Sequence, residues 1–259
     1  MKILTVCVVA ALAVSAVAGA YAADANKAVV NRDWTDSVAP AHQDAYEAGQ
    51  KAFNQCLREH GVKYNMLAYT HETGNTYKYS YVTGPYTWAD FDAADAAIKP
   101  CIATWRAQGN PHLDSETGAF MVDQPDMSHL PAGWATQPPP PILHVIYFTL
   151  KPGHDADMAF TDAVKKIAAA AAKTKWPYYF RMLQMRGGDE GSPDYLLVIA
   201  NKSWAEAGAQ PNPSVWKMVE NAYGKADADA MRKSLNDATA RSSDHFDRYN
   251  ADLSYVPGK

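Results

Sequence analysis

The sequence predicts an α+β protein made of two similar halves, each with the element order strand, helix, strand, strand, helix, strand. Three observations lead to this prediction. Helical and strand spacings of apolar residues follow each other in the same order in both halves. A hydroxyl-Trp-Ala-acid sequence stands at the same place in each half, at 87–90 and at 203–206. The halves are separated by the segment 125–141, whose four consecutive prolines favour an extended conformation.

The first helix of each half is expected at 41–60 and at 155–173. In both segments small and apolar residues recur three and four positions apart, which is the spacing of one buried helix face. The residues expected to point inward are Ala45, Ala52, Phe53, Cys56 and Leu57 in the first half, and Phe160, Val164, Ile167 and Ala171 in the second.

Two strands joined by a glycine-containing turn follow each of these helices. Alternating large side chains and the turn residues predict strands at 62–71 and 77–81 in the first half, and at 176–185 and 195–199 in the second. Tyr79 and Tyr195 stand in equivalent positions, nine residues before Trp88 and Trp204 respectively. This register supports an internal duplication.

The second helix of each half is expected to begin at the tryptophan, because a hydroxyl residue precedes it and an acidic residue follows in the first turn. A short strand then closes each half, at 118–123 and at 251–256. The expected organisation is a first repeat at 28–124, a linker at 125–141 and a second repeat at 142–259.

The N-terminal segment 1–22 has the pattern of a signal peptide. A short positive start precedes an apolar stretch, and Ala20-Tyr21-Ala22 fits the small-x-small cleavage rule. The apolar stretch, at 3–17, is shorter than the roughly 20 residues of a membrane-spanning helix. We therefore expect cleavage after Ala22, a periplasmic or secreted protein, and no membrane anchor after cleavage.

Charge and motifs exclude several classes of function. The formal net charge is −4 at pH 7, without the clustered basic residues that nucleic-acid binding requires. The eight histidines follow no zinc-site spacing, and the sequence has neither a phosphate-binding loop nor a covalent haem motif. The sequence therefore predicts no metal site, no cofactor and no nucleic-acid partner.

Two cysteines remain after the expected cleavage, Cys56 and Cys101. In an oxidising compartment an isolated pair is most often a disulfide, which is the interpretation we favour. Two buried free thiols are the alternative, and a nucleophilic cysteine ranks third because no histidine stands at a known spacing from either residue.

The predicted element order is the ferredoxin-like arrangement, an antiparallel sheet with both helices on one face. The other face needs a cover, so we expect the two sheets to pack together as an internal pseudo-dimer within one chain, which would then need no second copy and could be a monomer. On this pattern and the repeated Trp-Ala-acid triplet, the region 29–257 resembles the dimeric α/β-barrel superfamily in a fused tandem form, close to uncharacterised exported bacterial proteins.

The resemblance implies a choice between several functions, because the superfamily includes cofactor-independent monooxygenases, haem-degrading enzymes, peroxidases and proteins with no known reaction. Strand alternation places Asn65, Tyr69 and His71 on one face, and these are the candidate catalytic residues. The alternative is structural: His71 closes a turn at the surface, and Tyr69 packs against Tyr79 or Tyr81.

The candidate ligand-binding residues are aromatic or cationic and lie in both halves, where a sheet is expected to face its helices. Each has an alternative role in packing or at the surface. We favour binding of a small, partly aromatic or apolar ligand, with an oxygenase-like or haem-handling enzyme and an envelope interaction module as alternatives. The candidates are Tyr79, Trp88, Tyr179, Arg181, Tyr195 and Trp204.

Overall fold

The computed structural model describes residues 28–258 of the chain. The predicted signal peptide at 1–22 lies outside these residues. No helix in the described part is long and apolar enough to cross a membrane.

Eight antiparallel strands form one closed barrel, which confirms the predicted α+β class. Around the barrel the order is β1-β3-β2-β8-β5-β7-β6-β4, after which β4 pairs with β1. The strands are β1 (Val30–Val38), β2 (Met66–His71), β3 (Lys78–Tyr86), β4 (Leu113–Asp123), β5 (Ile142–Leu150), β6 (Arg181–Arg186), β7 (Tyr195–Asn201) and β8 (Thr239–Tyr255).

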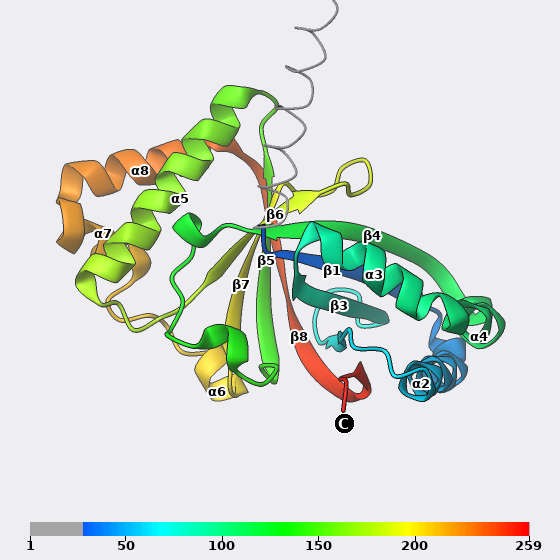
Figure 1. Ribbon diagram of the computed structural model, residues 1–259. Coiled ribbons are helices and arrows are strands. Elements are labelled where there is room, and N and C mark those ends of the chain that lie inside the picture. Colours follow the sequence, from blue (N-terminus) through cyan, green and yellow to red (C-terminus); the bar gives the residue numbers. More distant parts are fainter. Residues whose placement is uncertain (1–27, 259) are drawn as a thin grey trace, which may run out of the picture.

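The helices lie outside the barrel in two groups, with the strands between them (Figure 1). One group comes from the first half of the chain and the other from the second half. The first group is α2 (Gln43–Glu59), α3 (Trp88–Ile98) and α4 (Ile102–Gln108); the second is α5 (His154–Thr174), α6 (Trp204–Ala207), α7 (Val215–Tyr223) and α8 (Lys225–Ala238).

The strand order is the same within each half. In the first half it is β4-β1-β3-β2, and in the second it is β8-β5-β7-β6. The two sheets join edge to edge, through β2 with β8 and through β4 with β6. The sequence analysis expected two separate sheets packed face to face. In the structure the two sheets instead form one continuous sheet that closes into a barrel. The edge strands of each half are therefore hydrogen-bonded to the edge strands of the other half.

Several predicted elements agree closely with the structure. α2 and α5 match the expected helices, and α3 and α6 begin at the two tryptophans. Thr87 and Asp90 form a reciprocal capping box, and the Ser203 side chain accepts a hydrogen bond from the backbone of Glu206. The hydroxyl-Trp-Ala-acid sequence found in both halves therefore forms the N-terminal cap of a helix in each half.

Other predicted boundaries were wrong. β2 and β6 begin later than expected, because the residues before them still complete helix ends: the backbone N–H of Val62 donates to Leu57, and that of Trp176 to Ala171. The largest difference is β8, which has 17 residues where the sequence analysis expected a short strand at 251–256. The segment 125–141 contains two short 3-10 turns and packs on the second half, where His129 pairs with Phe180.

The inward face of α2 was predicted only in part. Phe53 and Leu57 are buried as expected, but Ala45 is exposed and Tyr46 is fully buried in its place. The hydroxyl of Tyr46 donates to Asp36 and lies 2.9 Å from the hydroxyl of Tyr81. A buried polar contact therefore occupies part of the face that was expected to be apolar. All four inward residues predicted for α5 are buried.

A disulfide joins Cys56 to Cys101, as predicted. It connects α2 to the short turn before α4 and closes a ring of about 45 residues. Loop-closure entropy for a ring of this size gives about 4 kcal/mol of stabilisation.

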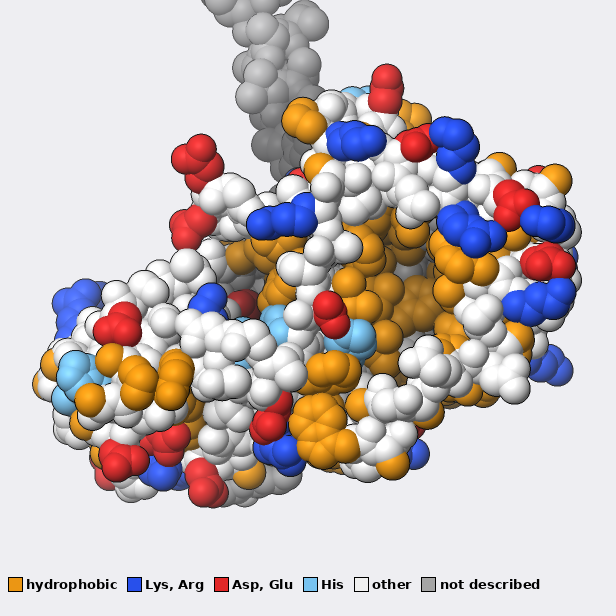
Figure 2. Space-filling model, turned by 180° about the vertical axis from the view of Figure 1, so that it is seen from behind, with side chains coloured by type: hydrophobic (Ala, Val, Ile, Leu, Met, Phe, Trp, Pro, Cys, Tyr) orange, Lys and Arg blue, Asp and Glu red, His pale blue; other side chains and the backbone are white. Residues whose placement is uncertain are grey.

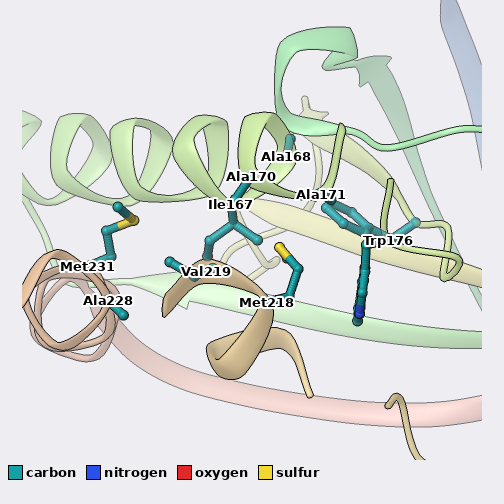
Figure 3. Packing of buried hydrophobic residues seen from close by; sticks show 10 residues of the cluster. Ile167, Ala168, Ala170, Ala171, Trp176, Met218, Val219, Ala228 and Met231 are labelled. Atoms are coloured by element: carbon teal, nitrogen blue, oxygen red, sulfur yellow. The ribbon is translucent and has the colours of Figure 1, made fainter. Parts of the chain in front are cut away.

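The helices of the second half share a compact apolar core (Figure 3). Ile167 on α5 faces Met218 and Val219 on α7, and Met231 on α8 extends the same cluster. Trp176 closes the cluster at the end of α5, and its indole N–H donates to the carbonyl of Pro213. This core holds the three helices together beside the sheet.

Seen from the opposite side, the molecule has a hollow where hydrophobic side chains gather, with histidine and acidic side chains near its edge (Figure 2). Basic and acidic side chains are interspersed around it. The described part of this face therefore presents no extended patch of one charge.

Candidate functional site

The inner face of the barrel carries a polar cluster at one end. Successive strand residues point to opposite faces. On β6 and β7, Met182 and Tyr195 pack under α5, whereas their neighbours Leu183 and Leu196 belong to a separate cluster inside the barrel. The same alternation directs His71 on β2, and His245 and Asp247 on β8, to the interior.

His71, His245 and Asp247 meet because β2 and β8 are neighbours, with His71 paired directly with Asp247. The two imidazole rings stack with centroids 4.2 Å apart and planes 14° from parallel. The Nε2 atoms of His71 and His245 lie 3.7 Å and 3.1 Å from the Asp247 carboxylate. Asp247 is only 4 % exposed, so this histidine–carboxylate cluster is held inside the protein.

A cavity of about 370 Å³ opens onto this cluster. Tyr147 on β5 lines it and stacks on His245 at 5.4 Å, so three planar rings follow one another along the wall. The polar side chains of the lining come from strands of both halves. They include Asp33, Thr35, His71, Lys78, Tyr147, Arg241, Ser243, Asp244 and His245.

Burial changes the chemistry of two of these groups. Removal from water raises the pKa of Asp33 to about 7, although a hydrogen bond from Thr35 opposes the change. Burial also lowers the pKa of His71 to about 4, against the attraction of Asp247. Near pH 7 the carboxyl group of Asp33 therefore gains and loses its proton readily, whereas the imidazole of His71 is uncharged.

An apolar cluster occupies the barrel next to the polar one. Met121, Val145, Leu183 and Leu196 are buried and come from β4, β5, β6 and β7. Met185 and Tyr147 pack against this cluster and also line the cavity. A ligand in the cavity would therefore meet polar walls and an apolar surface together.

The structure separates the three residues predicted as catalytic. Tyr69 and His71 are on the inner face, but Tyr69 packs edge-to-face against Tyr249, with ring centroids 5.6 Å apart, and does not line the cavity. The Asn65 side chain is used in local structure, since it donates to the carbonyl of Gly84 and accepts from the Tyr86 hydroxyl. His71 alone of the three lines the cavity, and its side chain is only 8 % exposed, so it does not close a surface turn.

Tyr79 and Tyr195 occupy equivalent positions on the outer faces of the two sheets, under α2 and α5. Both are buried, and each hydroxyl donates to an acidic helix residue, Glu47 and Asp157 respectively. Neither lines the cavity.

The remaining predicted ligand-binding residues are dispersed. Trp88 packs on Phe120 at 4.8 Å, and Trp204 is 42 % exposed beside Phe246. Tyr179 is 44 % exposed and stacks on His129. The structure does not bring these side chains together.

Arg181 was expected at the surface or on a ligand carboxylate. It lies instead on the inner face of β6, paired with Asp123, and its guanidinium is 4.6 Å from the Trp134 ring. Burial lowers its pKa and raises that of Asp123, with their mutual attraction acting the other way on each. Arg181 therefore joins β6 to β4 and to the segment 125–141.

The sequence analysis missed Asp33, Tyr147, His245 and Asp247. The signal for the last two was the alternation of Ser243, His245 and Asp247, which places polar residues on one face of a strand. Because this inner face lines a cavity, the segment lacks the apolar alternation by which a strand is normally detected.

Comparison with known proteins supports the fold. No described protein family matches the sequence, and no curated protein is similar to it in sequence. Among solved structures, the anthrone oxidase-like protein has a TM-score of 0.53 at 10 % identity, covering 90 % of this chain and 94 % of that one. The putative monooxygenase of Lactobacillus acidophilus has a TM-score of 0.52 at 8 % identity, covering 89 % and 97 %. That of Fusobacterium nucleatum has a TM-score of 0.50 at 14 % identity, covering 86 % and 92 %.

These similarities, together with the closed barrel, show that the chain has the fold of the dimeric α/β-barrel superfamily, as its sequence pattern suggested. Identities of this size establish the fold alone, and function has to be argued from the site.

Haem, which the superfamily's haem-handling members suggest, does not fit the core beneath the second group of helices. A haem iron needs an axial side chain such as histidine. The two buried clusters under α5, α7 and α8 contain no histidine among the described residues, and His154 at the start of α5 is exposed. His129 borders one cluster beside Phe180, but its Nε2 atom is bonded to the carbonyl of Trp176.

Proposed function

We propose that the protein binds a small planar ligand with polar substituents in the cavity at the barrel end. The stack of Tyr147, His245 and His71 along the cavity wall supports this proposal most directly. Stacked rings favour a flat partner, and the surrounding hydroxyl, carboxyl and cationic groups offer donors and acceptors to its edge. The volume, about 370 Å³, lies in the range of small-molecule sites.

Filling the cavity tests this proposal. Ser243 lines the cavity, whereas its neighbour Ser242 points to the opposite face of β8. A metabolite library rich in aromatic acids and phenols is screened by thermal shift against the wild type, and every hit is titrated against Ser243→Trp and Ser242→Trp. We expect hits whose affinity falls at least tenfold in Ser243→Trp and is retained in Ser242→Trp.

The absence of any hit would contradict the proposal. Equal affinity of the two variants for every hit would also contradict it, because binding would then lie elsewhere on the protein.

A second candidate function is oxygen-dependent oxidation of an electron-rich phenol without a cofactor. The observation that favours it is the His71 imidazole facing the cavity, together with the fold shared with an anthrone oxidase-like protein. In this reaction the His71 imidazole would accept the first proton from the substrate. A hydroquinone would lose two electrons and two protons to become a quinone, and dioxygen would take them up as hydrogen peroxide. With anthrone, one oxygen atom of dioxygen would become the new carbonyl oxygen and the other would leave as water.

Oxygen consumption tests the second candidate. With 1,4-hydroquinone or anthrone as probe, we expect uptake by the wild type and by His144→Gln, a change on the other face of β5, and a loss of at least tenfold in His71→Gln. Uptake no faster than in protein-free buffer, or equal uptake by both variants, would exclude this reaction for these probes.

We also propose that the two halves, 28–124 and 142–259, arose by internal duplication and act as a pseudo-dimer in an exported protein. The shared strand order, the two N-caps at Thr87 and Ser203, and the equivalent tyrosines support the duplication. The signal-like segment 1–22 and the disulfide support export to an oxidising compartment.

A further inference from the structure

The wall of the cavity holds three metal-ligand side chains whose donor atoms converge. The ring nitrogens of His71 and His245 and a carboxylate oxygen of Asp247 all lie within 4.8 Å of one another. They are carried by the paired strands β2 and β8, so regular sheet structure fixes their backbone positions. Sites built on rigid elements hold their ligands more reproducibly than sites on loops.

The spacing of these atoms suits a transition-metal ion. Zinc is bound tetrahedrally by histidine nitrogen and carboxylate oxygen at about 2.0–2.2 Å, which places neighbouring ligand atoms about 3.4 Å apart. The Nε2-to-carboxylate distances of 3.1 Å and 3.7 Å fall on either side of this value. Because the two rings stack nearly parallel, one imidazole has to rotate about its Cβ–Cγ bond for both ring nitrogens to face the same ion.

The burial of Asp247 also favours a cation. Its Oδ1 atom is buried and lies 3.1 Å from the His245 Nε2 atom without forming a hydrogen bond of good geometry. A buried carboxylate oxygen without a donor is costly, and a bound cation removes that cost. Asp33 lines the same cavity and adds a second carboxyl group to its wall.

The cluster also leaves room for a further ligand. His71 and His245 line the open cavity, so solvent or a bound molecule can reach an ion held between them. Three protein ligands with one open position are typical of catalytic metal sites, whereas structural zinc sites are closed by four.

We propose that His71, His245 and Asp247 bind one divalent transition-metal ion, such as Zn²⁺ or Fe²⁺, with an open coordination position facing the cavity. The inference rests on the proposed function in that the ion would form part of the same binding cavity and could coordinate a polar substituent of the planar ligand. The second possible ligand group, Cys56 with His60 and Cys101, is excluded because its sulfur atoms form the disulfide.

Metal binding by the purified full chain tests the proposal. The oxidised protein is stripped with a chelator and titrated calorimetrically with Zn²⁺ and spectroscopically with Co²⁺. We expect one ion per chain, a dissociation constant of about 10 µM or tighter, and visible Co²⁺ bands that Zn²⁺ displaces. In Asp247→Asn and in His71→Gln, affinity should fall at least tenfold.

The matched control is His144→Gln. His144 and Asp244 form a histidine–aspartate pair at 2.8 Å on β5 and β8 outside the cluster, so the control tests whether any such pair accounts for the binding. We expect affinity in this variant to equal that of the wild type. Circular dichroism and thermal unfolding show whether each variant is folded. If Asp247→Asn or His71→Gln fails to fold, the metal affinity of the other one tests the proposal.

No binding by the wild type at 100 µM ion, or equal losses in His144→Gln and the cluster variants, would overturn the metal proposal. The ligand screen is run with and without Zn²⁺. Hits in both conditions without metal binding would refute the metal site alone. Metal binding without any hit would refute only the proposed small-ligand function.

Discussion

Asp36 shows at the scale of one residue how burial determines charge in this protein. It lies on the outer face of β1 beneath α2, only 2 % exposed, and accepts a hydrogen bond of 2.6 Å from the Tyr46 hydroxyl. Its second oxygen has no donor among the described residues. Removal from water raises its pKa to about 7, although the bond from Tyr46 opposes the change.

This shift predicts a pH-dependent cost of keeping Asp36 buried. Between pH 3.8, the ordinary pKa, and about 7, the folded protein binds more protons at this site than the unfolded chain. The contribution of Asp36 to the free energy of unfolding therefore falls as pH rises through this range. The Asp36→Asn variant lacks this titrating group. The free energy of unfolding of the variant minus that of the wild type should therefore increase with pH, by up to about 1.4 kcal/mol per pH unit.

Urea unfolding at several pH values between 4 and 8 measures this difference. Asp114→Asn, which changes an exposed carboxyl group on β4, is the control and should leave the pH dependence unchanged. A wild type and an Asp36→Asn variant whose stabilities stay parallel between pH 4 and pH 7 would contradict the account of Asp36.

Also at this scale, the sequence analysis found part of the candidate site. Strand alternation correctly placed Tyr69 and His71 on one face, because residues two positions apart in a strand point to the same side. It could not show that His71 lies beside His245, since the two residues are 174 positions apart in the chain and meet only through the β2–β8 pairing. Tyr79 and Tyr195 were assigned to ligand binding because an aromatic residue in a packed core has the same local pattern as one in a pocket.

At the scale of elements, α2 and α4 approach each other unusually closely at Gly49. A Cβ atom added to Gly49 would lie 2.2 Å from the backbone carbonyl oxygen of Gln108. A backbone oxygen cannot move aside as a flexible side chain can. The absence of a side chain at this position therefore allows the two helices to pack.

We predict that Gly49→Ala destabilises the protein by about 2 kcal/mol, through overpacking. This sign is opposite to the usual effect of replacing glycine by alanine in a helix, which stabilises by up to about 1 kcal/mol. Chemical denaturation measures the change. Ala48→Gly, at the exposed neighbouring position, serves as the comparison and should cost about 1 kcal/mol by helix propensity alone. A Gly49→Ala variant more stable than the wild type would contradict the close approach.

Elements with a regular apolar period were predictable, and those that line the cavity were not. α5 follows the expected spacing because its inward residues are all apolar. β8 was expected to be short because its inner face carries Ser243, His245 and Asp247 in place of apolar residues. The polar residues on the inner face of β8 make it a candidate part of the site, and they are also the reason that its full length was not predicted from the sequence.

At the scale of the whole molecule, barrel closure creates the cavity. Pairing of β2 with β8 and of β4 with β6 brings residues of both halves to one wall, so neither half alone contains the histidine–carboxylate cluster. The repeated element order predicted the contents of each half, whereas edge-to-edge closure depends on contacts between residues distant in the chain.

The central claim is that the inside of the closed barrel, at the His71–His245–Asp247 cluster, is the binding centre of the protein. Anomalous diffraction at the zinc absorption edge, from crystals equilibrated with Zn²⁺, tests it most directly. We predict one dominant peak within bonding distance of both Nε2 atoms and the Asp247 carboxylate. An empty barrel interior, with peaks only at surface pairs such as His144 and Asp244, would contradict the claim.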